Sequence, residues 1–132
     1  MIKKLPVEKF KDLAEAKKYL EEWKHTLFLD DWFIKLILED KEIDCLENRS
    51  GCCDYVTQQH SAKIRLAHYL GDDFMVKQCE EVTLVHELLH CKKGYMSDND
   101  IVNIMEEQQI EDMAKSLIIC KYNLPREWFK NY

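Results

Sequence analysis

The sequence is poor in the residues that interrupt secondary structure. Its 132 residues include only three Gly and two Pro, so no stretch has the composition of a flexible linker. This scarcity predicts one domain over residues 1–132. An excess of basic residues is also missing, because 19 Lys and Arg stand against 25 Asp and Glu, a net charge of −6. Since contacts to nucleic-acid phosphates need a basic surface, we expect no nucleic-acid partner.

Long apolar runs are missing as well. No segment approaches the roughly 20 apolar residues that cross a bilayer. The N-terminal stretch Met1–Pro6 has a charged start but lacks the apolar run of a signal peptide. We therefore expect a cytoplasmic protein without a membrane partner. The six cysteines include no Cys-x-x-Cys pair, which disfavours a four-cysteine zinc ribbon and favours reduced thiols.

Hydrophobic periodicity predicts an α+β fold that begins with a helix and continues with a small three-stranded sheet. Apolar residues recur at helical spacing from Phe10 to Leu27 and alternate with period two over residues 31–38. A polar loop is expected from Glu39 to Gly51. Two short strands then follow near 53–58 and 62–67, and a tight connection would make them a hairpin.

Two helices complete the expected fold. The segment Gly71–Asp73 is a candidate N-cap, and it predicts a helix from Phe74 to Lys93 that Gly94 would end. A second capping signal at residues 97–100 opens a helix from Asp100 to Lys121. We expect these two helices to pack against each other.

The most informative segment is His86-Glu87-Leu88-Leu89-His90, inside the first of these two helices. Residues four apart lie on one face of a helix, so His86 and His90 can bind one zinc ion together. Glu87 is adjacent and can reach a water molecule held by that ion. Burying two histidines and a glutamate in such an apolar helix without a ligand would be costly. The pattern predicts a zinc site with Glu87 as the catalytic residue.

A catalytic zinc ion needs a third protein ligand and one open position for water. The longer three-histidine pattern fails, because Lys93 and Met96 occupy the positions that would need Gly and His. A carboxylate from the last helix is therefore expected. Glu107 is the favoured ligand, followed by Glu111 and then Glu106.

The segment Val82–His90 resembles the active-site helix of small zinc metallopeptidases from phage and bacterial genomes, which are similar in plan to SprT-like and other minimal gluzincin-type peptidases. The resemblance extends to Asp31–Ile34, Ala62–Leu66 and Glu107–Ala114, over about residues 10–120. It implies that residues 1–132 form a metallopeptidase-like domain. By this resemblance His86, His90 and Glu107 bind zinc and Glu87 is catalytic.

Such a site would hydrolyse peptide bonds. Glu87 would accept a proton from the metal-activated water and deliver it to the leaving amine. If the strand at residues 62–67 lies at the sheet edge, an extended peptide substrate could pair with it. An additional donor would stabilise the oxyanion, and the sequence offers four candidates without choosing among them: His60, His68, Tyr95 and Tyr122.

Two alternatives to a general peptidase remain open at this point. The first is a non-catalytic module in which a metal stabilises a protein-binding surface, with the acidic surface and the aromatic tail at 127–132 as the working parts. The second is a phage regulatory or host-interaction protein whose protease activity acts on one partner. The substrate and the oligomeric state are not predicted.

Overall fold

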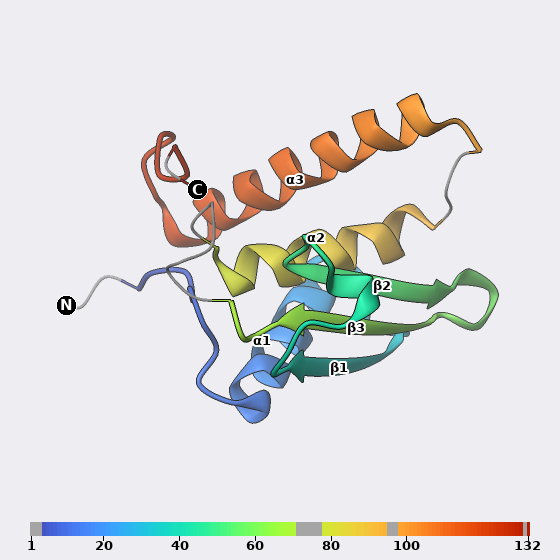
Figure 1. Ribbon diagram of the computed structural model, residues 1–132. Coiled ribbons are helices and arrows are strands. Elements are labelled where there is room, and N and C mark those ends of the chain that lie inside the picture. Colours follow the sequence, from blue (N-terminus) through green and yellow to red (C-terminus); the bar gives the residue numbers. More distant parts are fainter. Residues whose placement is uncertain (1–3, 71–77, 95–97, 131) are drawn as a thin grey trace.

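The computed structural model describes residues 4–70, 78–94, 98–130 and 132. Within these ranges it contains helices α1 (Leu13–Thr26), α2 (Glu80–Lys93) and α3 (Asp100–Tyr122) and a small mixed sheet, which confirms the α+β fold. Helix α2 lies between the sheet and α3, and the two helices pack together as expected (Figure 1). No helix of the described ranges has the length and hydrophobicity needed to cross a membrane.

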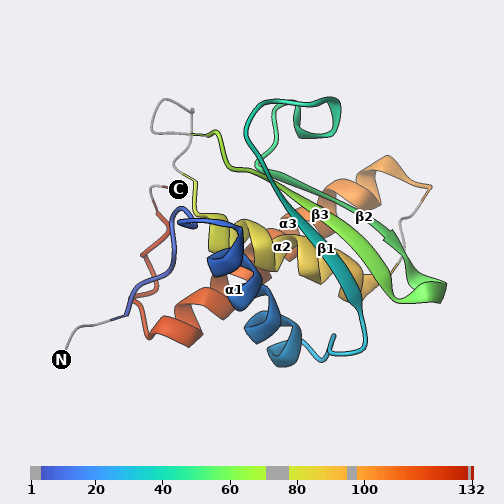
Figure 2. The same cartoon turned by 90° about the horizontal axis from the view of Figure 1, so that it is seen from below.

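The sheet consists of β1 (Phe33–Glu39), β2 (Gly51–Val56) and β3 (Ser61–Ala67), in the order β1-β3-β2. Strand β3 pairs in parallel with β1 and antiparallel with β2. The predicted hairpin of β2 and β3 is confirmed, and the short 3-10 turn η2 (Thr57–Gln59) connects its strands. Figure 2 shows β3 between the other two strands.

The expectation of a peptide-binding edge at residues 62–67 was wrong. Strand β3 occupies the centre of the sheet, so both of its sides are already hydrogen-bonded to neighbouring strands. The edges that could accept a further strand belong to β1 and β2. The parallel pairing of β1 with β3 joins segments that are distant in the sequence, and local periodicity does not reveal it.

One face of the sheet packs against the helices. In β3, Ala62, Ile64 and Leu66 are buried in the core, whereas Lys63 and Arg65 alternate with them on the outer face. Helix α1 begins after Asp12, whose carboxylate accepts a hydrogen bond from the backbone N–H of Glu15. It packs against both β1 and α2.

Helix α2 begins at Glu80, later than the predicted start at Phe74. The candidate cap Gly71–Asp73 lies outside the described residues. Cys79, the residue before the first turn, has an extended backbone. The backbone N–H groups of Glu80 and Glu81 donate to the carbonyls of Glu8 and Val7. The N-terminal segment therefore caps this helix, and that contact is not local in the sequence.

Helix α3 agrees closely with its prediction, because it spans Asp100–Tyr122 and Asn99 caps it. The Asn99 side chain accepts hydrogen bonds from the backbone N–H groups of Ile101 and Val102. Ala114 is fully buried on this helix. Its small side chain permits close packing of α3, which brings the acidic residues of α3 near the histidines of α2.

Candidate metal centre

The two histidines of the His-Glu-x-x-His segment lie together on α2, as their spacing predicts. The rings of His86 and His90 are 5.1 Å apart between centroids. The Glu107 carboxylate on α3 contacts both rings, with Oε1 2.6 Å from His86 Nε2 and Oε2 3.0 Å from His90 Nε2. The ligand atoms of the three residues lie within 4.8 Å of one another. These residues form a group that could hold a metal ion, and we call it the metal centre.

The other two acidic candidates on α3 have different partners. Glu111 Oε2 lies 2.9 Å from Nδ1 of His86, on the opposite side of the ring from Glu107. Glu111 is therefore placed to orient the His86 ring rather than to share its Nε2 position. Glu106 forms an ion pair with Lys93 at the end of α2. Because the three glutamates point in different directions around the axis of α3, each carboxylate has a different contact on α2.

The carboxylates strongly affect the protonation of His86. Burial lowers the pKa of this ring, but the hydrogen bonds to Glu107 and Glu111 outweigh burial and raise the pKa to about 10. The same contacts with His86 and His90 hold the pKa of Glu107 well below its ordinary range. Without a metal ion, the centre is therefore held together by ion pairs between a charged His86 and the two carboxylates.

Glu87 lies in a different environment, between α2 and strand β2. The residue is only 6% exposed. Burial raises the pKa of Glu87 to about 7, against the opposing effect of the positive charges of His86 and His90. Among the residues that the structure describes, no group donates a hydrogen bond to the Glu87 carboxylate.

Two further buried glutamates on α2 show how unusual this environment is. The Glu81 carboxylate is fully buried and accepts hydrogen bonds from the Trp23 indole, the Tyr122 hydroxyl and the Lys121 ammonium. Glu80 accepts a hydrogen bond from the Phe10 backbone and contacts His68. Such partners are the usual requirement for a buried carboxylate. Glu87 lacks them within the described ranges, which leaves its oxygens available to a water molecule or a ligand.

A glycine that the sequence analysis did not single out, Gly51, packs against α2 beside Glu87. A Cβ atom added to Gly51 would lie 2.7 Å from Cγ2 of Thr83 and 3.5 Å from Cγ of Glu87. Only a residue without a side chain lets β2 approach α2 this closely. The sequence holds only three glycines, so each is a candidate for a close contact. That count alone does not predict that Gly51 packs against Thr83 and Glu87.

The oxyanion candidates do not gather at the metal centre. His60 contacts Asp31, His68 contacts Glu80, and Tyr122 donates to Glu81 at the beginning of α2. Tyr95 lies outside the described residues. The three described candidates are therefore engaged in structural contacts elsewhere.

The cysteines take no part in the metal centre among the described residues. All six are free thiols, as expected. Cys91 follows His90 in the sequence, but its Sγ turns towards Cys53 Sγ, 3.5 Å away. The Cys79 thiol donates to the Val7 carbonyl.

We compared the chain with protein-family models, with curated proteins and with solved structures, and none of the three comparisons gives a match. The interpretation of the centre rests on its own chemistry. Two imidazoles from α2 and one carboxylate from α3 lie close together. Glu87, on the same helix as the imidazoles, is buried and has no hydrogen-bond donor among the described residues.

Proposed function

We propose that this chain is a zinc-dependent metallopeptidase that hydrolyses peptide bonds with Glu87 as the general base. His86, His90 and Glu107 would be the metal ligands. The observation that carries the proposal is the contrast among the buried glutamates of α2. Glu80 and Glu81 have several hydrogen-bond partners, whereas Glu87 has none within the described ranges. A carboxylate of this kind beside a metal-binding group is the arrangement that a water-activating base requires.

Zinc is the metal that this donor set favours, because two imidazoles and one carboxylate are a common catalytic zinc set. Three protein ligands leave a position for water. When bound, the ion supplies Lewis acidity, which lowers the pKa of water and polarises the scissile carbonyl. The position also suits a metal cation, because its ligand His90 lies in the last turn of α2, where the helix dipole favours positive charge.

The residues of the chain have distinct tasks in this mechanism. Glu87 removes a proton from the attacking water and returns it to the leaving amine, and a pKa of about 7 suits both transfers. Glu107 holds its position between the two rings from α3. Glu111 hydrogen-bonds to Nδ1 of His86 and so directs the Nε2 atom of the ring towards the ion.

The peptide substrate is best accommodated along β2. This strand is at the edge of the sheet, and its first residue, Gly51, packs beside Glu87. An extended peptide paired with the outer edge of β2, which no other described strand occupies, would pass close to the base. This placement replaces β3, whose two sides are both paired.

A second candidate function is a non-catalytic, metal-stabilised interaction module, including a phage regulatory protein. One observation favours it. The first turns of α3 expose large apolar side chains, with Ile101 70%, Ile104 68% and Met105 58% exposed. Apolar side chains grouped at a surface are typical of contacts with other proteins.

The first experiment measures metal content. Protein purified without added metal is analysed by mass spectrometry beside the His86→Ala variant. We expect about one zinc ion per chain in the parent protein and its loss in the variant. Another metal in the parent protein would contradict the zinc assignment, and equal metal content in both proteins would contradict the site.

The second experiment separates catalysis from metal binding. Glu87→Gln should retain the metal and lose about 100- to 10,000-fold in hydrolysis, whereas Glu107→Gln should lose both metal and hydrolysis. New peptide N-termini in a denatured protein mixture provide the readout, so that a narrow substrate preference is also detected. Equal cleavage by the parent protein and Glu87→Gln would refute the catalytic proposal and favour the interaction module.

A further inference from the structure

Strand β2 carries two neighbouring cysteines that face opposite sides of the sheet. The Sγ atom of Cys52 lies 2.7 Å from Sγ of Cys45, which belongs to the 3-10 turn η1 (Asp44–Leu46). On the other side, Cys53 Sγ lies 3.5 Å from Cys91 Sγ on α2. Both pairs are free thiols. The sulfur atoms of Cys45 and Cys52 need less movement than those of the second pair to reach bonding distance.

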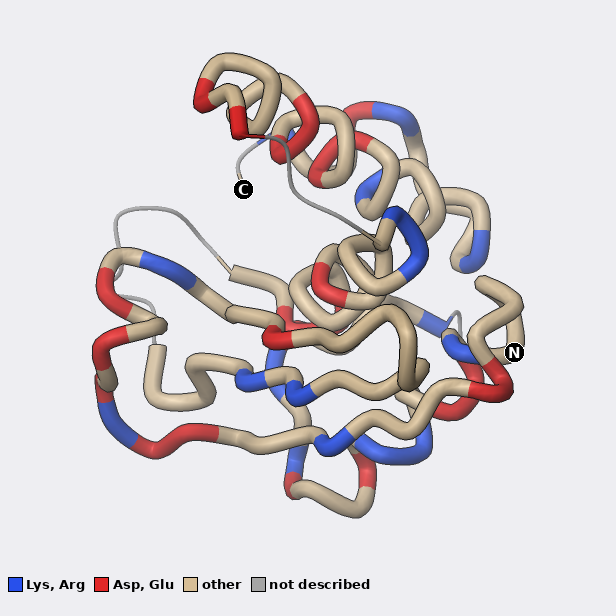
Figure 3. The backbone as a smooth tube through the Cα atoms, turned by 90° about the vertical axis from the view of Figure 1, so that its right-hand side faces the viewer, with Lys and Arg blue, Asp and Glu red and all other residues tan. Residues whose placement is uncertain are grey.

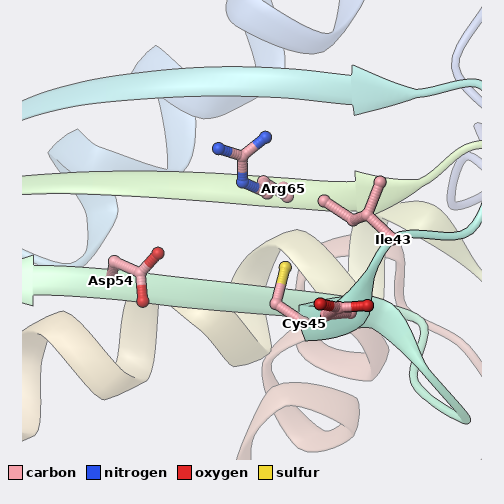
Figure 4. Close-up of a pocket in the computed structure, with 5 residues that line it drawn as sticks. Ile43, Cys45, Asp54 and Arg65 are labelled. Atoms are coloured by element: carbon pink, nitrogen blue, oxygen red, sulfur yellow. The ribbon is translucent and has the colours of Figure 1, made fainter.

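Cys45 is also reachable from solvent. It lines an open hollow of about 500 Å³ together with Ile43, Asp44, Asp54 and Arg65. Figure 4 shows these side chains around the hollow, on the outer face of the sheet. The Arg65 guanidinium is paired with Glu39 Oε1 at 2.7 Å. The opening of the hollow leaves the Cys45 thiol accessible to a small reagent from solvent.

Cys52 is more enclosed than Cys45. The residue is 8% exposed, and burial raises the pKa of its thiol to about 12. A thiol of this kind is a poor first nucleophile. The two thiols therefore differ in access: Cys45 can meet a reagent from solvent, whereas Cys52 is buried next to Cys45 and can react with it second.

We propose that Cys45 and Cys52 form a thiol–disulfide exchange site that takes a small soluble disulfide, such as oxidised glutathione, and becomes an intramolecular disulfide. Cys45 attacks one sulfur atom of the reagent, forms a mixed disulfide and releases one thiol that takes up the Cys45 proton. Cys52 then attacks Cys45 Sγ, forms the Cys45–Cys52 bond and releases the second thiol with its own proton. The two protein thiols are oxidised and the reagent is reduced to two thiols.

The resulting bond would restrain the segment that precedes β2. Ser50 accepts a hydrogen bond from the Thr83 hydroxyl, and Gly51 packs beside Thr83 and Glu87. Closing the ring from Cys45 to Cys52 fixes this segment against α2. Gly51 lies beside Glu87, so the restraint would reach the residue that we propose as the base. That consequence rests on the proposed function, whereas the formation of the disulfide does not.

The test uses the reduced full chain and oxidised glutathione. We expect the intact mass to fall by two hydrogen atoms, without accumulation of a glutathione adduct. Arg49 lies between the two cysteines, so tryptic cleavage places Cys45 and Cys52 in separate peptides that the new bond joins. The joined peptides should be found in metal-free and metal-loaded protein alike, so a failed peptidase assay does not affect this result.

Matched variants identify the bond. Cys52→Ser should stop at a glutathione adduct on Cys45, and Cys45→Ser should form no intramolecular bond in this segment. Cys53→Ser changes the neighbouring residue of the same strand and should still form the disulfide. A bond through Cys53 in the parent protein, or a stable glutathione adduct on Cys45 when Cys52 is present, would overturn the proposal.

Discussion

The protonation of His86 gives a quantitative prediction for metal binding. In the metal-free centre both ring nitrogens are held by carboxylates, Nε2 by Glu107 at 2.6 Å and Nδ1 by Glu111 at 2.9 Å. These contacts raise the pKa of the ring to about 10 in spite of its burial. Because a ligating histidine must be neutral, a metal ion has to displace the Nε2 proton.

The size of the effect follows from the pKa. At pH 7 the ring is about three units below a pKa of about 10, so proton competition weakens metal binding by about 1,000-fold relative to a neutral ring. From His86 alone, each rise of one pH unit between pH 6 and 9 should therefore strengthen the apparent affinity about tenfold. The partial exposure of Glu107 reduces the shift without changing its direction.

Two measurements test this reasoning. Nuclear magnetic resonance of the metal-free protein should show both nitrogens of the His86 ring protonated at pH 8. Zinc titration by calorimetry, in buffers of different ionisation enthalpy, should show proton release to which His86 alone contributes about one proton per ion. The titration is made at pH 6.5, where a metal-bound water with a pKa of about 7 is mostly un-ionised.

The choice of variants removes the contribution of Glu87, while His90, which also has to be neutral as a ligand, contributes to both proteins equally. The calorimetric experiment uses Glu87→Gln, because burial raises the pKa of Glu87 to about 7 and this group also titrates in the range. His25→Gln serves as a control, since His25 is an exposed histidine that contacts Asp30. A His86 ring that becomes neutral near pH 6.5 in the metal-free protein would refute the reasoning.

Three further predictions concern stability. Gly51→Ala would place a Cβ 2.7 Å from Cγ2 of Thr83, so we expect a loss of about 1–3 kcal/mol in urea unfolding; unchanged stability would contradict the close packing. Tyr122→Phe removes a hydroxyl that donates to the buried Glu81 carboxylate, so we expect a loss of about 1–3 kcal/mol, and an equal melting temperature would argue against this role. Burial raises the pKa of Glu87 from 4.5 to about 7. The metal-free protein should therefore lose about 3 kcal/mol as the pH rises from below 4.5 through 7, and an unchanged pH dependence in Glu87→Gln would exclude Glu87 as its source.

The helices and the histidine pair were predictable because they depend on local spacing. The interval between His86 and His90 places both rings on one face of any α-helix. The choice among Glu106, Glu107 and Glu111 was not settled by sequence, because it depends on the rotation of α3 against α2. That rotation is set by packing at residues such as Ala114, which is fully buried.

The order of the strands was less predictable for a related reason. The hairpin of β2 and β3 joins neighbouring segments, so alternation and a short connection were sufficient to find it. The parallel pairing of β1 with β3 joins Phe33–Glu39 to Ser61–Ala67, and the whole of β2 lies between these two segments in the sequence. The beginning of α2 is also fixed at a distance, because Val7 and Glu8 bind its first N–H groups. Each of these contacts requires knowledge of the tertiary structure.

The charged residues at the two ends of α2 have different surroundings: acidic residues occupy the first turn, and His90 lies in the last turn. Glu80 and Glu81 lie in the first turn, where the helix dipole stabilises carboxylates and donors from other elements surround them. His90 lies in the last turn, where the dipole favours a positive ion. Acidic residues are also frequent on the facing helix α3 (Figure 3), which adds attraction for a cation. Glu87 lies between these regions, next to His86 on the same helix, and among the described residues it lacks the donors that hold the acids of the first turn.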